Sequence, residues 1–436
     1  GTLFDLDDDR ERPADPVAEL QRQRAAVAAA PQPGRIDRLL AAESAGALIA
    51  AEMRYAGLPW SVERHEEILR ELLGPRPPEG ERPARLAAAL DRVRHLLAAP
   101  DLNPDSPGEL LKALGRAGLQ ATSTRSWELK EIKSPAIPPL LEYKKLARLL
   151  SSNGWNWLDT WVAGGRFRPD YVPGGAATGR WGASGGGALQ LPKQIRGAVV
   201  ADPGWKLVVA DAAQLEPRIL AALSGDRGMV EAGAAGDLYA GIVASGAVEN
   251  RAQAKIAMLG AMYGATSGES GRLMPRLTRA YPKAIAMVED AARAGERGDI
   301  VTTRLGRSSP RGRTVDYDEQ ASEADVNRTR GQARAWGRFT RNFIVQGTAA
   351  EWALCWMAGI RRRMSVLADG AWLTDAPHLV FFLHDEVVVH CPAELTETVT
   401  DLVAEAAAEA GQLLFGALPA EFPVTVAVVD NYGQAK

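Results

Sequence analysis

The segment 378–391, HLVFFLHDEVVVHC, constrains the fold more than any other part of this sequence. Its two apolar runs, LVFFL and VVV, are rich in β-branched and aromatic residues, as is typical of adjacent buried strands. Between them stand His384, Asp385 and Glu386, where a short hairpin usually has Asn-Gly or Asp-Gly. We therefore expect a stiff hairpin whose tip presents ionisable groups, although a solvated turn would also fit the pattern.

A second carboxylate, Asp211, follows another apolar run. The residues WKLVVAD predict a buried strand that ends at Asp211, and AQLEPRILAALSGD predicts a helix that Gly225 terminates. Two aspartates that meet at strand tips repel each other unless a divalent cation lies between them. Asp211 and Asp385 are therefore candidate ligands for two Mg²⁺ ions, of the kind that clamp the attacking and leaving oxygens in phosphoryl transfer. The alternative is that Asp211 only caps the helix that follows it.

The segment RAQAKIAMLGAMYG predicts a helix with one chemically distinctive face. The residues at i, i+4 spacing are Arg251, Lys255, Leu259 and Tyr263. Each step advances about 40° around the helix, so the four form one slowly winding stripe. The two cations repel each other in isolation, but a triphosphate would turn this repulsion into attraction, and the apolar half of the stripe could receive a base or a sugar. The alternative is an ordinary surface helix whose Leu and Tyr face the core.

The net charge of −3 does not suggest a nucleic-acid-binding protein, but the charges are unevenly distributed. Residues 251–341 hold 17 Lys and Arg against 10 Asp and Glu, whereas residues 386–436 hold one against eight. A basic region beside an acidic one is compatible with a face that binds a polyanion, and also with Arg-rich solvated helices. The two cysteines, Cys355 and Cys391, lack CxxC spacing, which favours a reducing cytoplasm and argues against a zinc site. The absence of a long apolar run or a signal peptide predicts no membrane partner.

Composition separates an N-terminal segment from the rest of the chain. Residues 1–42 open with FDLDDDRER and end in an Ala- and Pro-rich stretch, so we expect a tail or linker there. Helical spacing begins at Glu43 and continues to about residue 150, ahead of the Gly-rich segment GGAATGRWGASGGGALQLP. With 436 residues, the chain is long enough for two or three domains or one enzyme with several lobes.

Five segments, in this order and spacing, resemble the motifs of family A DNA polymerases, the bacterial DNA polymerase I type. VVADAAQLEPRILAALSGD is similar to motif A (D-Y-S-Q-I-E-L-R), RAQAKIAMLGAMYG to motif B (R-x-x-x-K-x-x-x-F-G-x-x-Y-G), and FLHDEVVVH to motif C, the V-H-D-E hairpin. ATGRWGASGGGALQLP is similar to the segment before motif A, and RFTRNFIVQGTAAEW to the segment between motifs B and C. The resemblance runs from about Glu43 to the C-terminus.

The resemblance implies an α+β right-hand polymerase fold, with an antiparallel-sheet palm, helical fingers and a helical thumb. The expected segments are a tail or the end of a missing exonuclease-like domain at 1–42, the thumb at 43–150, the palm at 151–225 and 342–436, and the fingers at 226–341. The implied activity is that of a DNA-directed DNA polymerase without its own exonuclease. Its implied partners are primer–template DNA and dNTPs, and its implied cofactors are two Mg²⁺ ions, with Mn²⁺ as a substitute. The resemblance also implies a monomer that works in the bacterial cytoplasm, associated with the nucleoid.

The resemblance also implies a role for each matching residue. Asp211 and Asp385 match the metal-binding catalytic carboxylates, Glu386 the auxiliary acid, and Lys255 a proton donor to pyrophosphate as well as a triphosphate ligand. The implied nucleotide-binding residues are Arg251, Lys255, Leu259, Tyr263, Gln214, Glu216 and Tyr239. Among them, Glu216 matches the steric gate that disfavours a ribose 2′-OH. The implied DNA-binding residues are Arg180, Arg338, Asn342, Gln346 and His384.

The chain departs from the family pattern around the expected nucleotide pocket. Ala212-Ala213 replaces Tyr-Ser in motif A, Leu259 replaces the aromatic residue of motif B, and Tyr239 stands where a D-I-H sequence usually has His. Three alternatives follow: a single-subunit RNA polymerase of the phage type, a catalytically weakened protein that only binds primer–template DNA, and a metal-dependent nuclease. Glu216 argues against the first, and the retained metal and phosphate ligands argue against the second. No acidic set outside FDLDDD supports the third.

Overall fold

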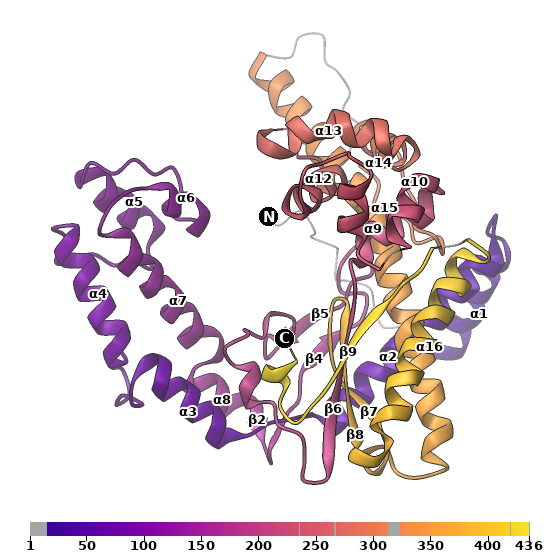
Figure 1. Ribbon diagram of the computed structural model, residues 1–436, viewed down its shortest axis with the longest axis horizontal. Coiled ribbons are helices and arrows are strands. Elements are labelled where there is room, and N and C mark those ends of the chain that lie inside the picture. The colour runs from indigo at the N-terminus through magenta and orange to yellow at the C-terminus, as the bar shows by residue number, and fades with distance from the viewer. Residues whose placement is uncertain (1–14, 235, 266, 313–322, 419, 436) are drawn as a thin grey trace.

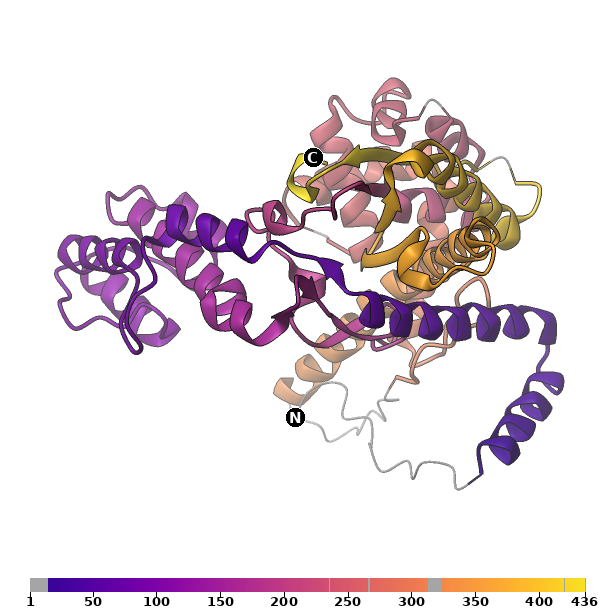
Figure 2. The same cartoon turned by 90° about the horizontal axis from the view of Figure 1, so that it is seen from below.

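The computed structural model of the chain describes residues 15–234, 236–265, 267–312, 323–418 and 420–435. A helical arm stands on one side and a helical lobe on the other, with an antiparallel sheet between their bases (Figure 1). The same elements seen from below show the arm extending away from the sheet and the lobe (Figure 2). None of the helices in these described ranges is long and apolar enough to cross a membrane.

The central sheet has four antiparallel strands in the order β7-β8-β6-β9. The strands are β6 (Trp205–Ala212), β7 (His378–Leu383), β8 (Glu386–Pro392) and β9 (Val424–Val429). The expected hairpin is confirmed, because β7 pairs with β8, and β6 lies between β8 and β9. The side chains of Val387, Val388 and Val389 are fully buried, which accounts for the uninterrupted apolar run in β8.

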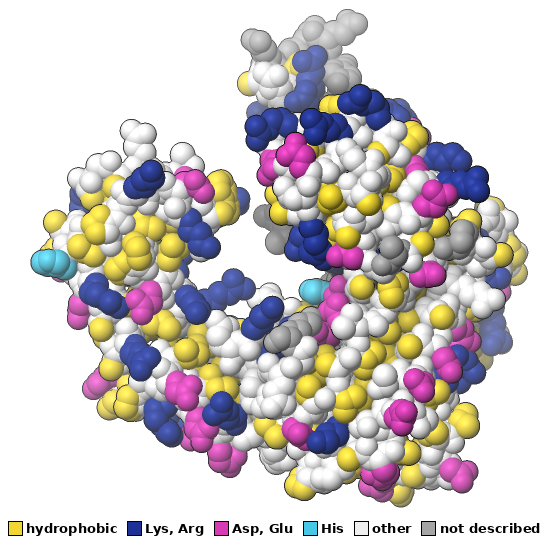
Figure 3. All heavy atoms as spheres, in the orientation of Figure 1, with side chains coloured by type: hydrophobic (Ala, Val, Ile, Leu, Met, Phe, Trp, Pro, Cys, Tyr) yellow, Lys and Arg dark blue, Asp and Glu magenta, His cyan; other side chains and the backbone are white. Residues whose placement is uncertain are grey.

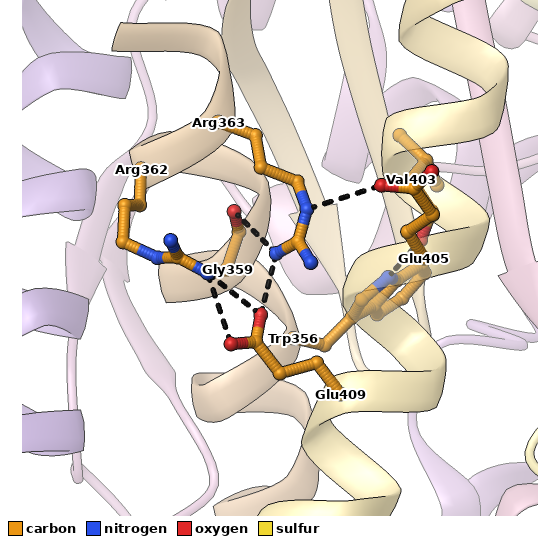
Figure 4. A network of polar contacts seen from close by, with 7 residues as sticks. All are labelled: Trp356, Gly359, Arg362, Arg363, Val403, Glu405 and Glu409. Carbon is orange, nitrogen blue, oxygen red and sulfur yellow. Dashed lines mark hydrogen bonds and ion pairs between the residues drawn. The ribbon is translucent and has the colours of Figure 1, made fainter. Parts of the chain in front are cut away.

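Two long helices, α15 (Glu323–Ala368) and α16 (Thr396–Phe415), pack against each other and support the sheet. Figure 4 shows their polar contacts, in which the indole N–H of Trp356 donates to the carbonyl of Val403 at 3.0 Å. Arg362 Nη2 lies 2.9 Å from each carboxylate oxygen of Glu409, and Arg363 also pairs with Glu409. α15 continues beyond the sheet into the lobe, where it packs on α14, so one helix connects both regions.

The lobe consists of short helices that follow β6. Helix α9 (Leu215–Ser224) leads from the sheet into this lobe, whose own helices are α10 (Arg227–Gly233), α11 (Leu238–Ala244), α12 (Arg251–Tyr263), α13 (Gly268–Ala280) and α14 (Pro282–Glu296). The predicted helix end is confirmed, because α9 stops at Gly225, whose φ of 59° is the left-handed conformation that glycine adopts readily. Asn250 caps the start of α12 by accepting from the N–H of Gln253, and Gly264, with a φ of 73°, ends it.

The arm has a small hydrophobic core of its own, which includes Leu97, Leu110, Leu129 and Leu140. Its helices are α3 (Val62–Leu73), α4 (Ala84–Leu96), α5 (Pro107–Arg116), α6 (Ser126–Glu131), α7 (Ile137–Asn153) and α8 (Trp155–Trp161).

An aromatic cluster joins the arm to the rest of the chain. The rings of Trp60, His65, Trp157 and Phe167 lie with centroids 5.0 to 5.7 Å apart. Short strands complete the region: β1 (Leu58–Pro59), β2 (Val162–Ala163) and β3 (Arg166–Phe167) form one sheet, and β4 (Asp170–Val172) and β5 (Gly182–Gly185) another.

The expectation of a tail or linker at 1–42 is wrong from Pro16 onward. Helix α1 (Pro16–Ala28) and helix α2 (Pro33–Ala56) occupy this region, whereas residues 1–14 lie outside the described residues. The Ala- and Pro-rich composition is compatible with a linker, but Pro16 and Pro33 stand at the first positions of α1 and α2, where the missing N–H of proline costs nothing, and Ala favours helix.

The expected segment boundaries also need correction. The boundary at 43 falls inside α2, which packs on α15 and β7, so residues 43–56 lie with the sheet and not with the arm. The boundaries at 150 and 341 fall inside α7 and α15, because single helices cross from one region to the next.

Candidate active site

Two aspartates meet at one edge of the central sheet. Asp211 lies opposite Glu386 in the β6–β8 register, and the N–H of Ala212 donates to the carbonyl of Asp385 at 2.9 Å. The turn that carries Asp385 is tight, since its N–H donates to the carbonyl of Leu383 at 2.8 Å. Both aspartates are half-buried, so each side chain is accessible from solvent while its backbone is held in the sheet.

The tip residue, His384, has a φ of 60°, a left-handed conformation that is uncommon outside glycine. Burial lowers the pKa of its imidazole and the cation of Arg180 lowers it further, which favours the neutral ring. A strained tip residue of this kind persists only where the surrounding structure holds it.

A cavity of about 70 Å³ opens beside Asp385. Among its lining residues are Arg180, Glu216, His384 and Asp385, together with apolar side chains that include Trp181. These four polar residues come from three distant parts of the sequence, and all four were predicted as site residues. The structure therefore brings the segment before motif A, motif A itself and the motif C hairpin to one place.

Glu216, in the first turn of α9, is held from two directions. Arg180 Nη2 forms an ion pair with its Oε1, and the hydroxyl of Tyr263 donates to its Oε2 at 3.1 Å. Burial raises the pKa of Tyr263 and the charge of Glu216 raises it further, so the phenol remains a neutral donor.

The predicted stripe on α12 is confirmed as a surface feature. Arg251, Lys255, Leu259 and Tyr263 are all exposed, whereas Ala254, Ala257, Met258, Ala261 and Met262 on the other side are buried. Lys255 has no ion pair with any carboxylate in the described part of the chain. Leu259 is 38% exposed, so it faces solvent and not the core.

Arg251, at the start of α12, is bound by neighbours that sequence reasoning did not connect to it. Its Nε lies 2.8 Å from Oδ2 of Asp237, and its guanidinium lies 5.4 Å from the ring centre of the buried Tyr239. Gln214 donates to Oδ1 of Asp237 at 2.6 Å and accepts from the N–H of Leu238 at 2.8 Å. Burial alone would raise the pKa of Asp237, but the hydrogen bonds from Arg251 and Gln214 hold it below its usual range.

Glu386 differs from the other predicted site residues because its side chain is only 2% exposed. Its Oε1 lies 3.2 Å from Nη1 of Arg196 and accepts a hydrogen bond from the hydroxyl of Tyr432. The strand register places Glu386 beside the two aspartates, but its carboxylate is bound inside the protein.

The remaining predicted residues lie along α15. Arg338, Asn342 and Gln346 follow at i, i+4 spacing, with Arg338 exposed and the other two half-buried. Arg338 packs against Gly264, because a Cβ at Gly264 would lie 3.0 Å from the Cγ of Arg338. This face of α15 therefore adjoins the end of the stripe on α12.

A wide hollow separates the arm from the lobe, and Lys and Arg side chains gather on both of its walls (Figure 3). On the arm, a groove of about 870 Å³ is lined by polar and apolar side chains, among which Arg82, Lys144, Lys145 and Arg148 are basic. Sequence reasoning missed this set, although the segment EYKKLARLL places its Lys and Arg within one turn of a helix. The last three have no ion pair with a carboxylate among the residues that the structure describes, so their charge remains available to an anion.

The two aspartates fit a magnesium site by the chemistry of their donors. Mg²⁺ prefers oxygen ligands, keeps several waters, and is commonly held by one or two carboxylates together with substrate phosphates. No group of three or more His, Cys, Asp or Glu side chains able to hold a metal occurs within the described ranges. A site here would therefore depend on Asp211 and Asp385 together with ligands from the substrate.

The fold matches that of a solved polymerase domain, described as "POL domain of Pol1 from M. smegmatis complex with DNA primer-template and dNTP". The TM-score is 0.71 at 21% sequence identity, and the match covers 89% of this chain and 69% of that chain. The fold is thus the right-hand polymerase fold, in which the antiparallel sheet is the palm, the helical lobe the fingers and the helical arm the thumb.

The profile of DNA polymerase family A matches residues 84–434, and the chain belongs to this family. It is 28% identical over 353 residues to the thermostable DNA polymerase I of Thermus thermophilus, covering 73% of this chain and 39% of that protein. It is 26% identical over 394 residues to DNA polymerase I of Pseudomonas aeruginosa, covering 80% of this chain and 40% of that protein. The chain therefore spans about two fifths of the length of these relatives.

Proposed function

We propose that this chain is a DNA-directed DNA polymerase that adds deoxynucleotides to a primer 3′-OH and releases pyrophosphate. The observation that carries the proposal is the meeting of Asp211 and Asp385 at one sheet edge, next to a cavity that also receives Arg180 and Glu216. The hydrogen bond between Tyr263 and Glu216 connects this edge to the cationic stripe on α12. Family membership and the two-carboxylate donor set support the same reaction.

Asp211 and Asp385 would hold two Mg²⁺ ions, with Mn²⁺ as a substitute. When bound, these ions lower the pKa of the primer 3′-OH and neutralise charge on the reacting phosphates. Protein side chains would bind the triphosphate and supply a proton. Arg251 offers the triphosphate a forked contact, and Lys255, whose ammonium has no carboxylate partner in the described residues, offers a point charge and a proton for the departing pyrophosphate.

The nucleotide pocket is proposed to lie between the palm edge and α12. Glu216, fixed by Arg180 and Tyr263, occupies the space that a ribose 2′-OH would need, which selects deoxynucleotides. Leu259 offers an apolar surface to the base or sugar. Gln214 and Tyr239 act at the same pocket by holding Asp237 and Arg251 in place.

Primer–template DNA is proposed to lie in the hollow between thumb and fingers. Arg180, Arg338, Asn342, Gln346 and His384 would contact it near the primer end, largely through the minor groove, whose acceptors are similar for every correct base pair. The basic groove of the thumb adds contacts to the phosphates farther away. The solved structure of similar fold is a complex with primer–template DNA and dNTP, which supports this placement.

The proposed subdomains follow the observed helices. We assign the thumb to α3–α8, the fingers to α10–α14 with the first half of α15, and the palm to α2, the central sheet, α9, α16 and the second half of α15. We further propose that the polymerase acts as a monomer and works in the bacterial cytoplasm at the nucleoid; its bacterial relatives support the cytoplasmic setting.

Primer extension on a defined template tests the proposal directly. Each dNTP and each rNTP is supplied in turn with Mg²⁺, and a parallel reaction contains a chelator. Template-directed extension with dNTPs that stops in the chelator supports the proposal. Extension with rNTPs at equal efficiency would contradict it and favour an RNA polymerase.

A second candidate is a catalytically weakened protein that binds primer–template DNA. The replacement of pocket residues by Ala212, Ala213 and Leu259 favours this candidate. Tight binding of primer–template DNA without extension under any metal condition would support it over the first.

A further inference from the structure

The carboxylate of Glu386 is enclosed by two side chains that no motif of the sequence connects to the site. Arg196 Nη1 lies 3.2 Å from its Oε1, and the hydroxyl of Tyr432 donates to the same oxygen. The guanidinium of Arg196 also lies over the ring of Tyr432, 4.5 Å from the ring centre. The exposed fraction is 11% for the Arg196 side chain, 2% for Glu386 and 1% for Tyr432, so the three form a closed, buried cluster.

This cluster is itself attached firmly to the palm. Tyr432 lies in the short helix η5 (Tyr432–Gln434), and its N–H donates to the carbonyl of Val199 at 3.0 Å. The preceding Asn431 donates its amide to the carbonyl of Gly197. Arg196 begins the short helix η2 (Arg196–Ala198), which packs on η5. These hydrogen bonds therefore hold in place the two segments that carry Arg196 and Tyr432, the donors to Glu386.

The backbone connects this buried cluster directly to Asp211 and Asp385. Glu386 follows Asp385 in the chain and lies opposite Asp211 in the strand register. The peptide that joins Asp385 to Glu386 also accepts the hydrogen bond from Ala212, at 2.9 Å. The tip before it contains His384 at a φ of 60°, which needs support from neighbouring structure. A side chain locked at Glu386 supplies that support from one side of the tip.

We propose that Arg196 and Tyr432 are positioning residues that act through Glu386 to hold Asp385 at its place beside Asp211. Glu386 then serves as the link between a buried anchor and the hairpin tip, and it does not reach the reacting atoms. This inference rests on the proposed polymerase function for its kinetic test, but its structural claim can be measured without catalysis.

The test uses Tyr432→Phe, which keeps the ring beneath Arg196 and removes only the hydroxyl. The matched control is Tyr281→Phe in the fingers. Tyr281 is 1% exposed and its hydroxyl hydrogen-bonds to Oγ of Ser245 at 2.9 Å, so the control removes the same kind of bond far from the palm. Each variant is measured for kcat, KM for dNTP, half-saturating Mg²⁺ and amide hydrogen exchange in residues 383–388.

Tyr432→Phe is expected to lower kcat about 10-fold and to raise half-saturating Mg²⁺, because loss of a supporting hydrogen bond behind a metal ligand typically costs 10- to 100-fold in affinity or activity. KM for dNTP should stay within about twofold, since the contacts of α12 are untouched. Exchange in residues 383–388 should accelerate in this variant alone. If Tyr432→Phe matches Tyr281→Phe in kcat, metal dependence and hairpin exchange, the inference is overturned.

Glu386→Gln separates positioning from catalysis by Glu386 itself. The amide oxygen can still accept from Tyr432 and Arg196, so we expect most of kcat to remain, whereas Asp385→Asn, the same change one residue earlier, should abolish it. Equal loss in both variants would contradict the positioning role. Absence of extension by the unaltered chain would instead contradict the proposed function, while the hydrogen-exchange comparison would still decide the anchor.

Discussion

The hydroxyl of Tyr263 donates a hydrogen bond to Oε2 of Glu216 at 3.1 Å and thereby ties the fingers helix α12 to the first turn of α9. Arg180 pairs with the other oxygen of the same carboxylate. Glu216 is only 15% exposed at its side chain, so one wall of the cavity beside Asp385 is set by three residues that are distant in sequence. The discrimination between sugars that we propose depends on this fixed carboxylate.

Replacing Glu216 by Ala should increase the use of ribonucleotides. The shortened side chain leaves space for a 2′-OH, and a gain of about 1.4 kcal/mol in the competing transition state would change the ratio about tenfold. The measurement is the ratio of kcat/KM for rNTP to that for dNTP. Glu231→Ala, at an exposed position on α10, is the control. An unchanged ratio in Glu216→Ala would place sugar discrimination elsewhere.

Replacing Asp211 or Asp385 by Ala should lower extension more than about 100-fold, because the lost charge stabilisation is worth several kcal/mol. Both side chains are half-buried at a strand end, so the fold should persist. Primer extension, thermal unfolding and primer–template binding are measured together, with Asp290→Ala on the surface of α14 as the control. Extension near the parental rate at ordinary Mg²⁺ concentration would remove the two-metal assignment.

Binding of primer–template DNA should weaken steeply with salt despite the net charge of −3. Affinity for DNA comes from the local release of counterions, so Lys144→Ala and Arg148→Ala should each reduce the log–log slope by about one. Arg92→Ala is a suitable control, because Arg92 already pairs with Glu142 at 2.9 Å. A slope near zero, or equal changes in the control, would show that the thumb groove does not carry the DNA.

Leu259→Phe should lower KM for dNTP by up to about tenfold, because stacking on an aromatic ring is worth roughly 1–3 kcal/mol. Leu259 is 38% exposed on the stripe of α12, which leaves room for the larger ring. Steady-state kinetics are measured for Leu259→Phe and for Leu259→Met, a control that changes the side chain at nearly constant volume without adding a ring. An unchanged or higher KM with a reduced kcat would indicate that the pocket has been repacked around leucine.

The free energy of unfolding should decline as the pH rises through the pKa of Glu351, a residue on α15. This side chain is 1% exposed, and burial raises its pKa from 4.5 to about 7, although Thr303 and the N–H of Leu305 donate to it. Because the pKa is higher in the folded than in the unfolded state, the folded state binds the proton more tightly. The free energy of unfolding should therefore fall between about pH 4.5 and 7, by about 3 kcal/mol in total.

Glu351→Gln keeps an acceptor without the charge and should abolish this dependence. The measurement is the midpoint of thermal unfolding at pH 5.5 and pH 8, compared with the parent and with the surface variant Glu397→Gln. A parent that is equally stable at both pH values, or a Glu351→Gln variant with the parental dependence, would contradict the assignment.

Local patterns in the sequence were sufficient for the elements that carry the site. The hairpin β7–β8 follows from two continuous runs of β-branched and aromatic residues, the end of α9 from Gly225, and the exposed stripe of α12 from i, i+4 spacing. Composition alone does not distinguish a linker from α1 and α2, because Pro16 and Pro33 favour a helix only through their position at its first turn.

Only the tertiary structure determines which charged side chains are buried and which residues they pair with. Glu386 and Arg196 are separated by 190 positions in the chain, and Glu216 and Tyr263 by 47, so no local pattern could pair them. The sequence placed Glu386 next to Asp385 as a second acid, but packing of the C-terminal turn against η2 enclosed it with Tyr432. Side-chain burial depends on elements that meet after folding, and so the chemistry of a carboxylate cannot be determined from its position in a motif alone.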